Sequence, residues 1–249
     1  MKIISANVNG VRSAYKRGLT DFIRREKPDI LCLQEIKAKE EDLPKDFRFG
    51  DYNLFVNSAE KKGYSGVAVF TKEKPILVNT KLGLERFDKE GRLLKLEYPG
   101  FTLLNLYLPH GGRQKEKLDY KLEAYKKVFE RIKKLKSKNI VLIGDFNIAH
   151  KEIDLARSKE NRDNIMFTPQ ERGQINKLLS LGFVDSFRQF NRNSGNYTWW
   201  PYAFGARERN LGWRIDYAFV SDKLAKEIKK VTIYSDVVFS DHCPIGLEL

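Results

Sequence analysis

The feature that most constrains the fold is a series of short apolar, β-branched runs that recurs along the whole chain. Each run is bounded by turn-forming or charged residues, which is the pattern of a β-strand in a globular protein. The runs cover residues 3–4, 30–33, 66–70, 101–108, 140–143, 215–220 and 244–249. No Pro-, Gly- or Ser-rich linker divides the sequence and no short internal repeat is found. We therefore expect residues 1–249 to form a single domain, which is possible for a chain of this length.

Helical patterns lie between these runs. Apolar residues between 118 and 135 recur every three or four positions, which predicts a helix with one apolar face and lysines on the other. Thr168, Pro169 and Glu171 form a capping-box sequence that predicts a second helix start. A third helix is expected over residues 19–25. The mixture indicates an α/β fold, and periodicity alone leaves open whether there are one or two sheets.

The charge of the chain points to an anionic partner. Lys and Arg total 46 against 33 Asp and Glu, which gives a formal net charge of +13. Such an excess attracts polyanions, although a lysine-rich solvated surface would give the same count. The chain carries two cysteines, no signal-peptide pattern and no apolar stretch of the roughly 20 residues that cross a bilayer. We therefore expect a cytoplasmic protein without a membrane partner.

Polar residues with catalytic potential recur where apolar runs end. Asn7 follows the first run, Glu35 follows the second, and Asp145 follows residues 140–143. Asp216 differs because it lies inside the run 215–220, where a carboxylate needs a partner. Taken singly, each of these residues is more simply explained as a turn former. Their recurrence, together with the scarce histidine His242, favours a site built at strand ends.

Seven sequence blocks carry a resemblance to a known family. They are Asn7-Val8-Asn9-Gly10, Leu33-Gln34-Glu35, Gly63-Tyr64-Ser65-Gly66-Val67, Tyr107-Leu108-Pro109, Gly144-Asp145-Phe146-Asn147, Trp213-Arg214-Ile215-Asp216-Tyr217 and Ser240-Asp241-His242-Cys243-Pro244. In this order they resemble the signature blocks of the exonuclease III family, which includes bacterial exonuclease III and the apurinic/apyrimidinic endonucleases of eukaryotes and archaea. The resemblance covers essentially the whole chain.

The resemblance implies a fold and an activity. The implied fold is a four-layer α/β sandwich of the deoxyribonuclease I type, with two mixed sheets face to face and helices outside, formed by one catalytic domain over residues 1–249. The implied activity is Mg²⁺-assisted hydrolysis of the phosphodiester 5′ to an abasic site in duplex DNA. Many members also act as 3′→5′ exonucleases, 3′-phosphodiesterases and 3′-phosphatases. We expect a monomer that acts on DNA with abasic or damaged sites.

The resemblance also implies a metal site. Glu35 is the principal ligand, and Asn9, Asp241, Asp145 and Asn147 belong to the same region. Crowded carboxylates repel one another, and a divalent cation relieves that repulsion. Oxygen ligands without a Cys/His cluster favour Mg²⁺ or Mn²⁺ over zinc. Eukaryotic relatives carry Asp where this chain has Asn9, so the number of metal positions stays open.

Catalytic roles follow from the same blocks. Asp145 matches the residue that orients or deprotonates the attacking water, with Asn147 beside it. Asp216 and His242 match a carboxylate–imidazole pair, whereas the adjacent Asp241 should point to the other side of the strand. Two further residues, Asn7 and Tyr107, match donors to the phosphate oxygens. Whether Asp145, His242 or Tyr107 is the general acid or base stays open at this point.

Residues in basic and polar loops match the family's DNA contacts. They are Arg12, Ser13, Arg17, Tyr64, Arg113, Asn161 and Asn164. Arg113 matches an arginine that enters the helix opposite the lesion. For Arg12 and Arg17, a solvated charged surface is the simpler interpretation when the resemblance is set aside.

Three apolar residues match the wall of the family's abasic pocket. They are Trp199, Trp213 and Ile215, although a core position would be the ordinary interpretation of buried tryptophans. The small Ala203 stands where many relatives have a bulky wedge, which leaves room for a damaged base. We therefore expect incision at abasic sites and weaker incision at some damaged bases.

Two other function classes are compatible with parts of this sequence. A phosphatase or phosphodiesterase acting on small or lipid substrates would use the same type of site, but the positive charge and the Trp213-Arg214-Ile215-Asp216-Tyr217 block argue against it. A nucleic-acid-binding protein with an inactive site is disfavoured because Glu35, Asp145 and His242 are all present.

The net charge predicts salt-sensitive DNA binding. Each phosphate that the protein neutralises releases counterions, so the logarithm of duplex affinity should fall with the logarithm of salt concentration by roughly 0.9 per contact. Fluorescence anisotropy of a labelled duplex over a series of salt concentrations measures this slope. An affinity that does not change between low and moderate salt would contradict a nucleic-acid partner.

Overall fold

A computed structural model describes residues 1–44, 47, 49–135 and 139–249. Within these residues the strands form two six-stranded sheets. In their hydrogen-bonded order, the strands of the first sheet are β11 (Lys230–Ile233), β12 (Ile245–Glu248), β1 (Lys2–Asn7), β2 (Ile30–Gln34), β4 (Val67–Thr71) and β3 (Asn53–Asn57). Those of the second sheet are β5 (Leu77–Asn79), β6 (Leu93–Glu97), β7 (Thr102–Tyr107), β8 (Ile140–Asp145), β10 (Asp216–Ser221) and β9 (Phe183–Asp185).

Each sheet is mixed and has a parallel pair at its centre. β1 and β2 are parallel, as are β7 and β8, while the other neighbouring strands in both sheets are antiparallel. A parallel pair needs a crossover, and here helices supply it. The first crossover contains α1 (Val11–Lys16) and α2 (Leu19–Glu26), and the second contains α4 (Leu118–Lys133).

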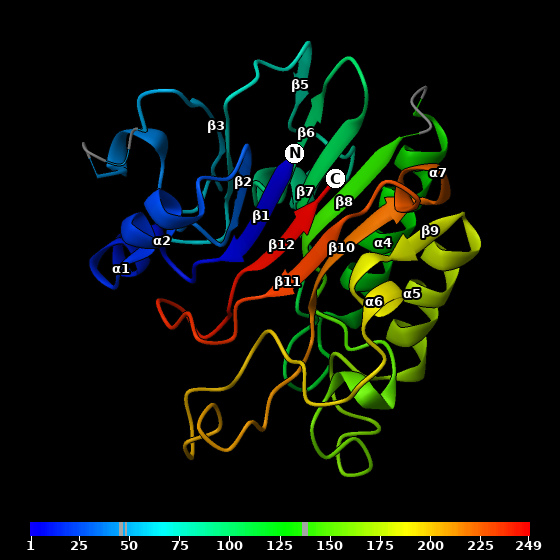
Figure 1. Cartoon of the computed structure of the whole chain (residues 1–249). Coiled ribbons are helices and arrows are strands. Elements are labelled where there is room, and N and C mark those ends of the chain that lie inside the picture. The colour runs from blue at the N-terminus through cyan, green and yellow to red at the C-terminus, as the bar shows by residue number, and fades with distance from the viewer. Residues whose placement is uncertain (45–46, 48, 136–138) are drawn as a thin grey trace.

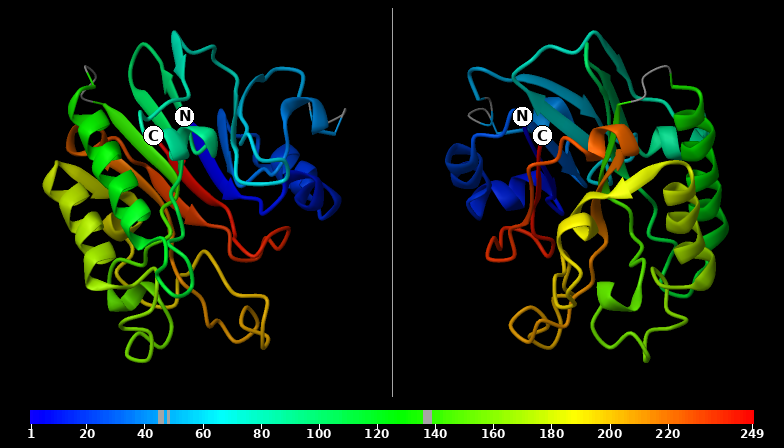
Figure 2. Two further views of the ribbon diagram at one scale, coloured as in Figure 1. Left: turned by 180° about the vertical axis from the view of Figure 1, so that it is seen from behind. Right: turned by 45° about the vertical axis from the view of Figure 1, so that its right-hand side comes forward.

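The helices cover the outer faces of the two sheets. Figure 2 shows α4 and α5 (Pro169–Ser180) on one side of the sheets and α1 and α2 on the other. The remaining short helices are η1 (Glu40–Asp42), α3 (Glu85–Lys89), η2 (Glu152–Asp154), α6 (Ser186–Phe190) and α7 (Asp222–Ala225). The four-layer α/β sandwich expected from the sequence is thereby confirmed.

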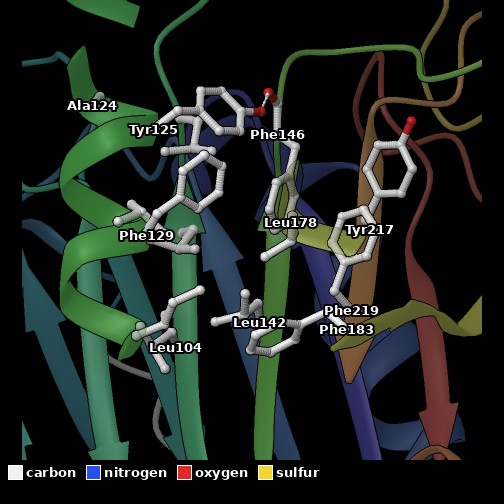
Figure 3. Close-up of a cluster of buried hydrophobic side chains, with 14 of the residues drawn as sticks. Leu104, Ala124, Tyr125, Phe129, Leu142, Phe146, Leu178, Phe183, Tyr217 and Phe219 are labelled. Atoms are coloured by element: carbon white, nitrogen blue, oxygen red, sulfur yellow. Dashed lines mark hydrogen bonds between the residues drawn. The ribbon is translucent and has the colours of Figure 1, made fainter. Parts of the chain in front are cut away.

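Every residue of the run 140–143 in strand β8 is apolar because both faces of the strand are covered. Val141 and Ile143 belong to the cluster between the two sheets, whereas Leu142 faces outward into the cluster under α4 and α5. In Figure 3, Leu142 lies with Phe129 of α4 and Leu178 of α5 in this outer cluster. Since successive side chains of a strand point to opposite faces, a strand covered on both faces has no polar position.

The expected helices are present, with small changes in their ends. Thr168 accepts a hydrogen bond from the Glu171 backbone N–H, and the capping box at the start of α5 is complete. The pattern over 118–135 forms α4, which ends at Lys133. Several elements were not predicted, namely β3, β5, β9, β11 and the short helices. The four strands are short or only partly buried, so their sequences lack a continuous apolar run.

Asp216 belongs to the predicted strand, but it is the first residue of that strand rather than an interior one. Strand β10 begins at Asp216, and in the antiparallel register Asp216 pairs with Asp145, the last residue of β8. The two carboxylates therefore share one end of the second sheet. The long segments between β8 and α5 and between α6 and β10 extend from the same end of the sandwich, while both termini lie toward the other end (Figure 1).

Both cysteines, Cys32 and Cys243, are buried and free. In the part of the chain that the structure describes, no helix is both long and apolar enough to cross a membrane.

A fully buried ion pair supports the segments around the strand ends. Lys121 of α4 and Glu171 of α5 have side chains with 0% exposure and form a short ion pair. The Lys121 Nζ also donates to the backbone carbonyls of Asn147 (2.6 Å) and His110 (3.0 Å). Glu171 in turn accepts from the backbone N–H groups of Met166 and Thr168, both at 3.0 Å. One buried cation thus joins two helices and two loops.

Lys121→Met should destabilise the fold strongly. The substitution leaves the Glu171 carboxylate buried without its cation, and breaking a buried pair in this way costs about 3–5 kcal/mol. Urea denaturation measures the free energy of unfolding. The matched control is Lys127→Met on the same helix, whose pair with Glu130 is exposed to solvent and should contribute little. Equal effects of the two substitutions would contradict a structural role for the buried pair.

Candidate active site

The centre of the site is the side chain of Asn7 at the end of β1. Its Nδ2 donates to Glu35 Oε2 at 3.2 Å and to Asp145 Oδ2 at 2.9 Å. Asn7 ends β1 and Glu35 directly follows β2 in the first sheet, whereas Asp145 ends β8 in the second, so this amide joins the two sheets at one end of the sandwich. Asn7 is buried, with 1% exposure, which holds the two carboxylates in a fixed relation.

Asp145 is held by the tight turn that follows β8. Its Oδ1 accepts from the backbone N–H of Asn147 at 2.8 Å, and its Oδ2 accepts from the Asn147 side-chain amide at 3.1 Å. Asn147 has a left-handed backbone, with φ of 52°. Gly144 has φ of 137°, and a Cβ at this position would lie 2.0 Å from the Leu106 carbonyl oxygen. Position 144 therefore requires glycine, and the left-handed backbone of Asn147 lets its N–H reach the Asp145 carboxylate.

Asp216 and His242 form the expected pair. His242 Nδ1 lies 2.9 Å from Asp216 Oδ2, and both side chains are buried. Thr198 Oγ1 accepts from the backbone N–H groups of Ile215 and Asp216, both at 3.1 Å, and so fixes the start of β10. Asp216 Oδ1 is buried without a hydrogen-bond partner. Ligand atoms of Asp145, Asp216 and His242 lie within 4.8 Å of one another, as a metal-binding group requires.

Asp241 does separate from His242, as predicted, although the two residues lie in a loop before β12 rather than on a strand. Its Oδ1 accepts from Asn9 Nδ2 at 2.9 Å, and its Oδ2 accepts from the indole Nε1 of Trp199 at 3.1 Å. Burial works against the charged form of Asp241, but the neighbouring His242 and these donors lower its pKa.

The pKa values in the buried cluster are strongly displaced. Burial, and then the charge of Asp216, raise the pKa of Asp145 to about 7. Burial alone would lower the pKa of His242, but the charge of Asp216 and the hydrogen bond to it raise that pKa to about 10. His242 is therefore an imidazolium at neutral pH, paired with the Asp216 carboxylate. Asp145 changes its protonation state near neutrality, which suits an acid or base.

The carboxylate of Glu35 already attracts a positive group. Lys37 Nζ lies 3.0 Å from Glu35 Oε1 and donates to Asn9 Oδ1 at 2.5 Å. The side chains of Glu35 and Lys37 are 20% and 32% exposed, so solvent ions can reach them. Glu35, Asn9 and Asp241 offer oxygen atoms at the edge of the site, and such a donor set fits Mg²⁺ or Mn²⁺.

Tyr107 ends β7 beside the site. The guanidinium carbon of Arg92 lies 4.4 Å from the centroid of the Tyr107 ring, and the Arg92 Nη1 donates to the Tyr107 carbonyl at 3.0 Å. Burial and the charge of Glu35 raise the pKa of Tyr107 well above its ordinary value. The phenol therefore keeps its proton and can donate it in a hydrogen bond to an anion.

The expected DNA-contacting residues lie on several surface segments. Arg12 and Ser13 are exposed on α1, Arg17 is exposed at its end, and Arg113 is exposed in its loop. Tyr64 is 36% exposed, and its hydroxyl accepts from Arg92 Nη2 at 3.1 Å.

Asn161 and Asn164 occupy the loop between β8 and α5. The amide of Asn164 donates to Asn161 Oδ1 at 2.8 Å. The Asn161 amide donates in turn to the Arg157 carbonyl at 2.9 Å. These contacts order the loop, and the Asn164 side chain stays exposed.

The three apolar residues assigned to the pocket do come together. Trp213 and Ile215 are buried in one cluster, and the partly buried Trp199 packs against it. Trp199 also forms isolated β-bridges with Trp213 and with His242, which place this cluster next to the Asp216–His242 pair. Ala203 is exposed in the loop before Trp213. Ile215 is a core residue at 1% exposure, whereas Trp199 retains an accessible face.

Comparison with known proteins agrees with this geometry. The model of the endonuclease/exonuclease/phosphatase family matches residues 4–242. The chain belongs to this family. It is 42% identical over 250 residues to an exodeoxyribonuclease of Bacillus subtilis, with 99% of this chain and 98% of that protein covered. It is 41% identical over 252 residues to a DNA-(apurinic or apyrimidinic site) endonuclease of Dictyostelium discoideum, with 99% and 70% covered.

A solved member of the endonuclease/exonuclease/phosphatase family has the same architecture. The structure of an AP endonuclease from Archaeoglobus fulgidus superposes with a TM-score of 0.91 at 31% identity and covers 100% of this chain and 99% of that one. The resemblance drawn from the seven sequence blocks is thereby confirmed at the level of the family and the fold.

Sequence reasoning missed three residues of this family site. Lys37 contacts Glu35 and Asn9, Arg92 packs on Tyr107, and Thr198 holds the start of β10. Lys37 lies only two residues after Glu35, so proximity in sequence was an available signal. Arg92 and Thr198 lie far from their partners along the chain, and no spacing rule connects them.

The paired cluster predicts how stability depends on pH. The folded-state pKa of His242, about 10, lies above its ordinary 6.5, so its contribution is complete below pH 6.5 and is lost as the pH rises toward 10. The raised pKa of Asp145 acts in the same direction at lower pH, because its contribution is lost as the pH rises from 3.8 to about 7. The melting temperature of the metal-free protein should therefore fall between pH 6.5 and 10.

Asp216→Asn should remove most of this alkaline decrease, because His242 loses the anion that raises its pKa. Thermal unfolding in chelator at several pH values measures the effect. The control is His150→Asn, since burial lowers the pKa of His150 and that residue cannot cause an alkaline loss. An undiminished decrease in Asp216→Asn would contradict the charged pair.

Proposed function

We propose that this protein is a metal-dependent nuclease of DNA repair that hydrolyses the phosphodiester 5′ to abasic sites in duplex DNA. The observation that carries the proposal is the Asn7 amide, which unites Glu35 and Asp145 beside the Asp216–His242 pair. The names of the relatives, an exodeoxyribonuclease and an apurinic/apyrimidinic endonuclease, support this reaction class. We include 3′→5′ exonuclease and 3′-phosphodiesterase activities, since both cleave the same kind of bond.

Glu35 is our choice for the residue that holds Mg²⁺ or Mn²⁺, with Asn9 and Asp241 on one side and Asp145 and Asn147 on the other. When bound there, the cation would supply a positive charge that polarises a phosphate oxygen. The Asp145–Asp216–His242 group is a second candidate by distance alone. It is a weaker one because the His242 imidazolium already neutralises Asp216.

The side chains divide the hydrolysis between them. Asp145 accepts the proton of the attacking water, since its raised pKa makes it a stronger base than an ordinary carboxylate. The Asn147 amide and backbone hold the Asp145 carboxylate in place. The amide of Asn7, the phenol of Tyr107 and the imidazolium of His242 are donors that stabilise negative charge as it develops on the phosphate. Asp216 orients His242 and maintains its charge.

Selectivity for abasic DNA is assigned to the apolar cluster of Trp199, Trp213 and Ile215. A nucleotide without a base is easier to extrude from the duplex, because no stacking or pairing is lost. A partly buried apolar surface next to His242 suits a bare sugar and disfavours a polar base. The exposed Ala203 leaves space nearby, so we expect weaker incision at some damaged bases.

The exposed basic and polar side chains would contact the DNA backbone. Arg12, Ser13 and Arg17 lie on one side of the chain's N-terminal segment, and Arg113 lies in the loop after β7. Asn161, Asn164 and Tyr64 would add neutral donors. A single catalytic domain, a monomeric state and a cytoplasmic location remain predictions from the sequence.

Glu35→Gln should abolish most incision while leaving duplex binding nearly intact. The substitution keeps the size of the side chain but removes the charge that attracts the cation, so the incision rate should fall at least about 100-fold. The assay uses a labelled duplex with one abasic site, incubated with Mg²⁺ or with chelator, beside an intact duplex and one with a damaged base.

Glu85→Gln is the matched control, since the Glu85 side chain is 81% exposed and forms an ion pair with Lys89 on α3. It should incise like the unchanged protein. Full activity of Glu35→Gln, or full activity in excess chelator, would contradict the proposed metal role. Equal cleavage of abasic and intact duplexes would contradict the proposed selectivity.

A further inference from the structure

A continuous chain of hydrogen bonds links the apolar cluster to Glu35. The indole Nε1 of Trp199 donates to Asp241 Oδ2 at 3.1 Å, and Asp241 Oδ1 accepts from Asn9 Nδ2 at 2.9 Å. Asn9 Oδ1 accepts from Lys37 Nζ at 2.5 Å, and the same Nζ lies 3.0 Å from Glu35 Oε1. The chain thus runs from the Trp199 indole through the side chains of Asp241, Asn9 and Lys37 and ends at Glu35.

We propose that Trp199 is a positioning residue whose indole N–H couples the apolar cluster to the metal-binding carboxylate. Through Asp241 and Asn9, it sets where Lys37 stands beside Glu35. This inference rests on the proposed function, because it takes the cluster as the lesion pocket and Glu35 as the metal ligand. It adds that DNA bound in the lesion pocket changes the affinity of Glu35 for the metal ion, and that the bound metal ion changes the affinity for DNA.

The chemistry of Asn9 makes the chain directional. A side-chain amide both donates and accepts, so Asn9 can face the Asp241 carboxylate with its Nδ2 and the Lys37 ammonium with its Oδ1. An aspartate at this position could accept from Lys37 but would place a second negative charge against Asp241. Asn9 has a left-handed backbone, with φ of 43°, and its backbone N–H donates to Asn7 Oδ1 at 3.0 Å. These contacts hold the amide in place.

The chemistry of Trp199 makes the first link specific. Indole is a donor only, and a phenylalanine would keep an aromatic wall while removing the N–H. Asp241 is only partly exposed, so loss of a donor leaves a carboxylate oxygen short of a partner and free to turn. Because Trp199 also touches the cluster of Trp213 and Ile215, a sugar that enters there displaces or steadies the indole.

Coupling of this kind is reciprocal. If metal binding strengthens the binding of abasic DNA by some factor, abasic DNA strengthens metal binding by the same factor. The Asp241–Asn9–Lys37 chain gives a physical path for this factor, since Lys37 must leave the Glu35 oxygen that a divalent cation takes. A lesion pocket that steadies Asp241 and Asn9 keeps Asn9 Oδ1 in place as the acceptor for the Lys37 ammonium when the cation displaces it from Glu35.

The first test measures metal binding without DNA. Mn²⁺ is titrated into the protein, and free Mn²⁺ is followed by its electron paramagnetic resonance signal. Trp199→Phe should bind Mn²⁺ more weakly, by about 5-fold or more if the coupling is of ordinary size. The matched control is Trp200→Phe, which also removes an indole donor, here from Asn210 at 3.2 Å, and should bind Mn²⁺ like the unchanged protein.

The second test measures the coupling itself. A duplex with a tetrahydrofuran abasic analogue and a non-hydrolysable phosphonate linkage is titrated with Mn²⁺ or with chelator present. The gain in affinity that Mn²⁺ produces should shrink in Trp199→Phe and persist in Trp200→Phe. Unchanged Mn²⁺ affinity and an unchanged gain in Trp199→Phe would overturn the coupling while leaving the nuclease assignment in place. Absence of Mn²⁺ binding in the unchanged protein would instead overturn the proposed metal role.

A third measurement applies if Trp199→Phe does not fold. The chain has three tryptophans, so a Trp200→Phe, Trp213→Phe variant emits from Trp199 alone. Addition of Mg²⁺ should shift or quench this emission, since the cation rearranges the chain that ends at the indole. An emission that does not respond to Mg²⁺ would contradict the coupling.

Discussion

The site depends on a buried amide contact between the two sheets. The Gln34 side chain at the end of β2 donates to Asn105 Oδ1 of β7 at 2.7 Å, and both residues are fully buried. The Asn105 amide donates in turn to the backbone carbonyls of Leu33 (3.1 Å) and Ala68 (3.0 Å) in the opposite sheet. Sliding one sheet over the other would break these hydrogen bonds and leave buried amide donors unpaired, which is costly.

This contact fixes how the two sheets lie against each other, and it thereby fixes the positions of the polar side chains at the strand ends. Glu35 is the next residue after Gln34, and Tyr107 lies two residues after Asn105 on the same strand. Asn7 and Asp145 then meet from the ends of β1 and β8. Apolar packing between the sheets supplies most of the attraction, but it is non-directional. The hydrogen bonds of the Gln34 and Asn105 amides are directional, and both residues lie beside the candidate active site.

The strands that could be predicted from sequence are those covered on both faces, such as β2, β8 and β10, because burial leaves them continuously apolar. The edge strands β3 and β11 are only partly buried, so their sequences carry no such run. Within the site, Asp145 and His242 were found because their blocks are local. Contacts such as Asn7 with Asp145, which are 138 residues apart, depend on how the sheets stack. Thr198 acts only through such contacts, which explains why it was missed, whereas Lys37 also contacts Glu35 two residues before it.

The central proposal is a division of charge within one site. Glu35 would attract the external cation, whereas His242 is paired with Asp216. A crystal soaked in Mn²⁺ and measured at the manganese absorption edge tests this division most directly, because the anomalous peak locates the ion without reference to activity. The account predicts a peak at the Glu35 carboxylate, with Lys37 displaced from it. A peak bound by Asp145, Asp216 and His242, with none at Glu35, would contradict it.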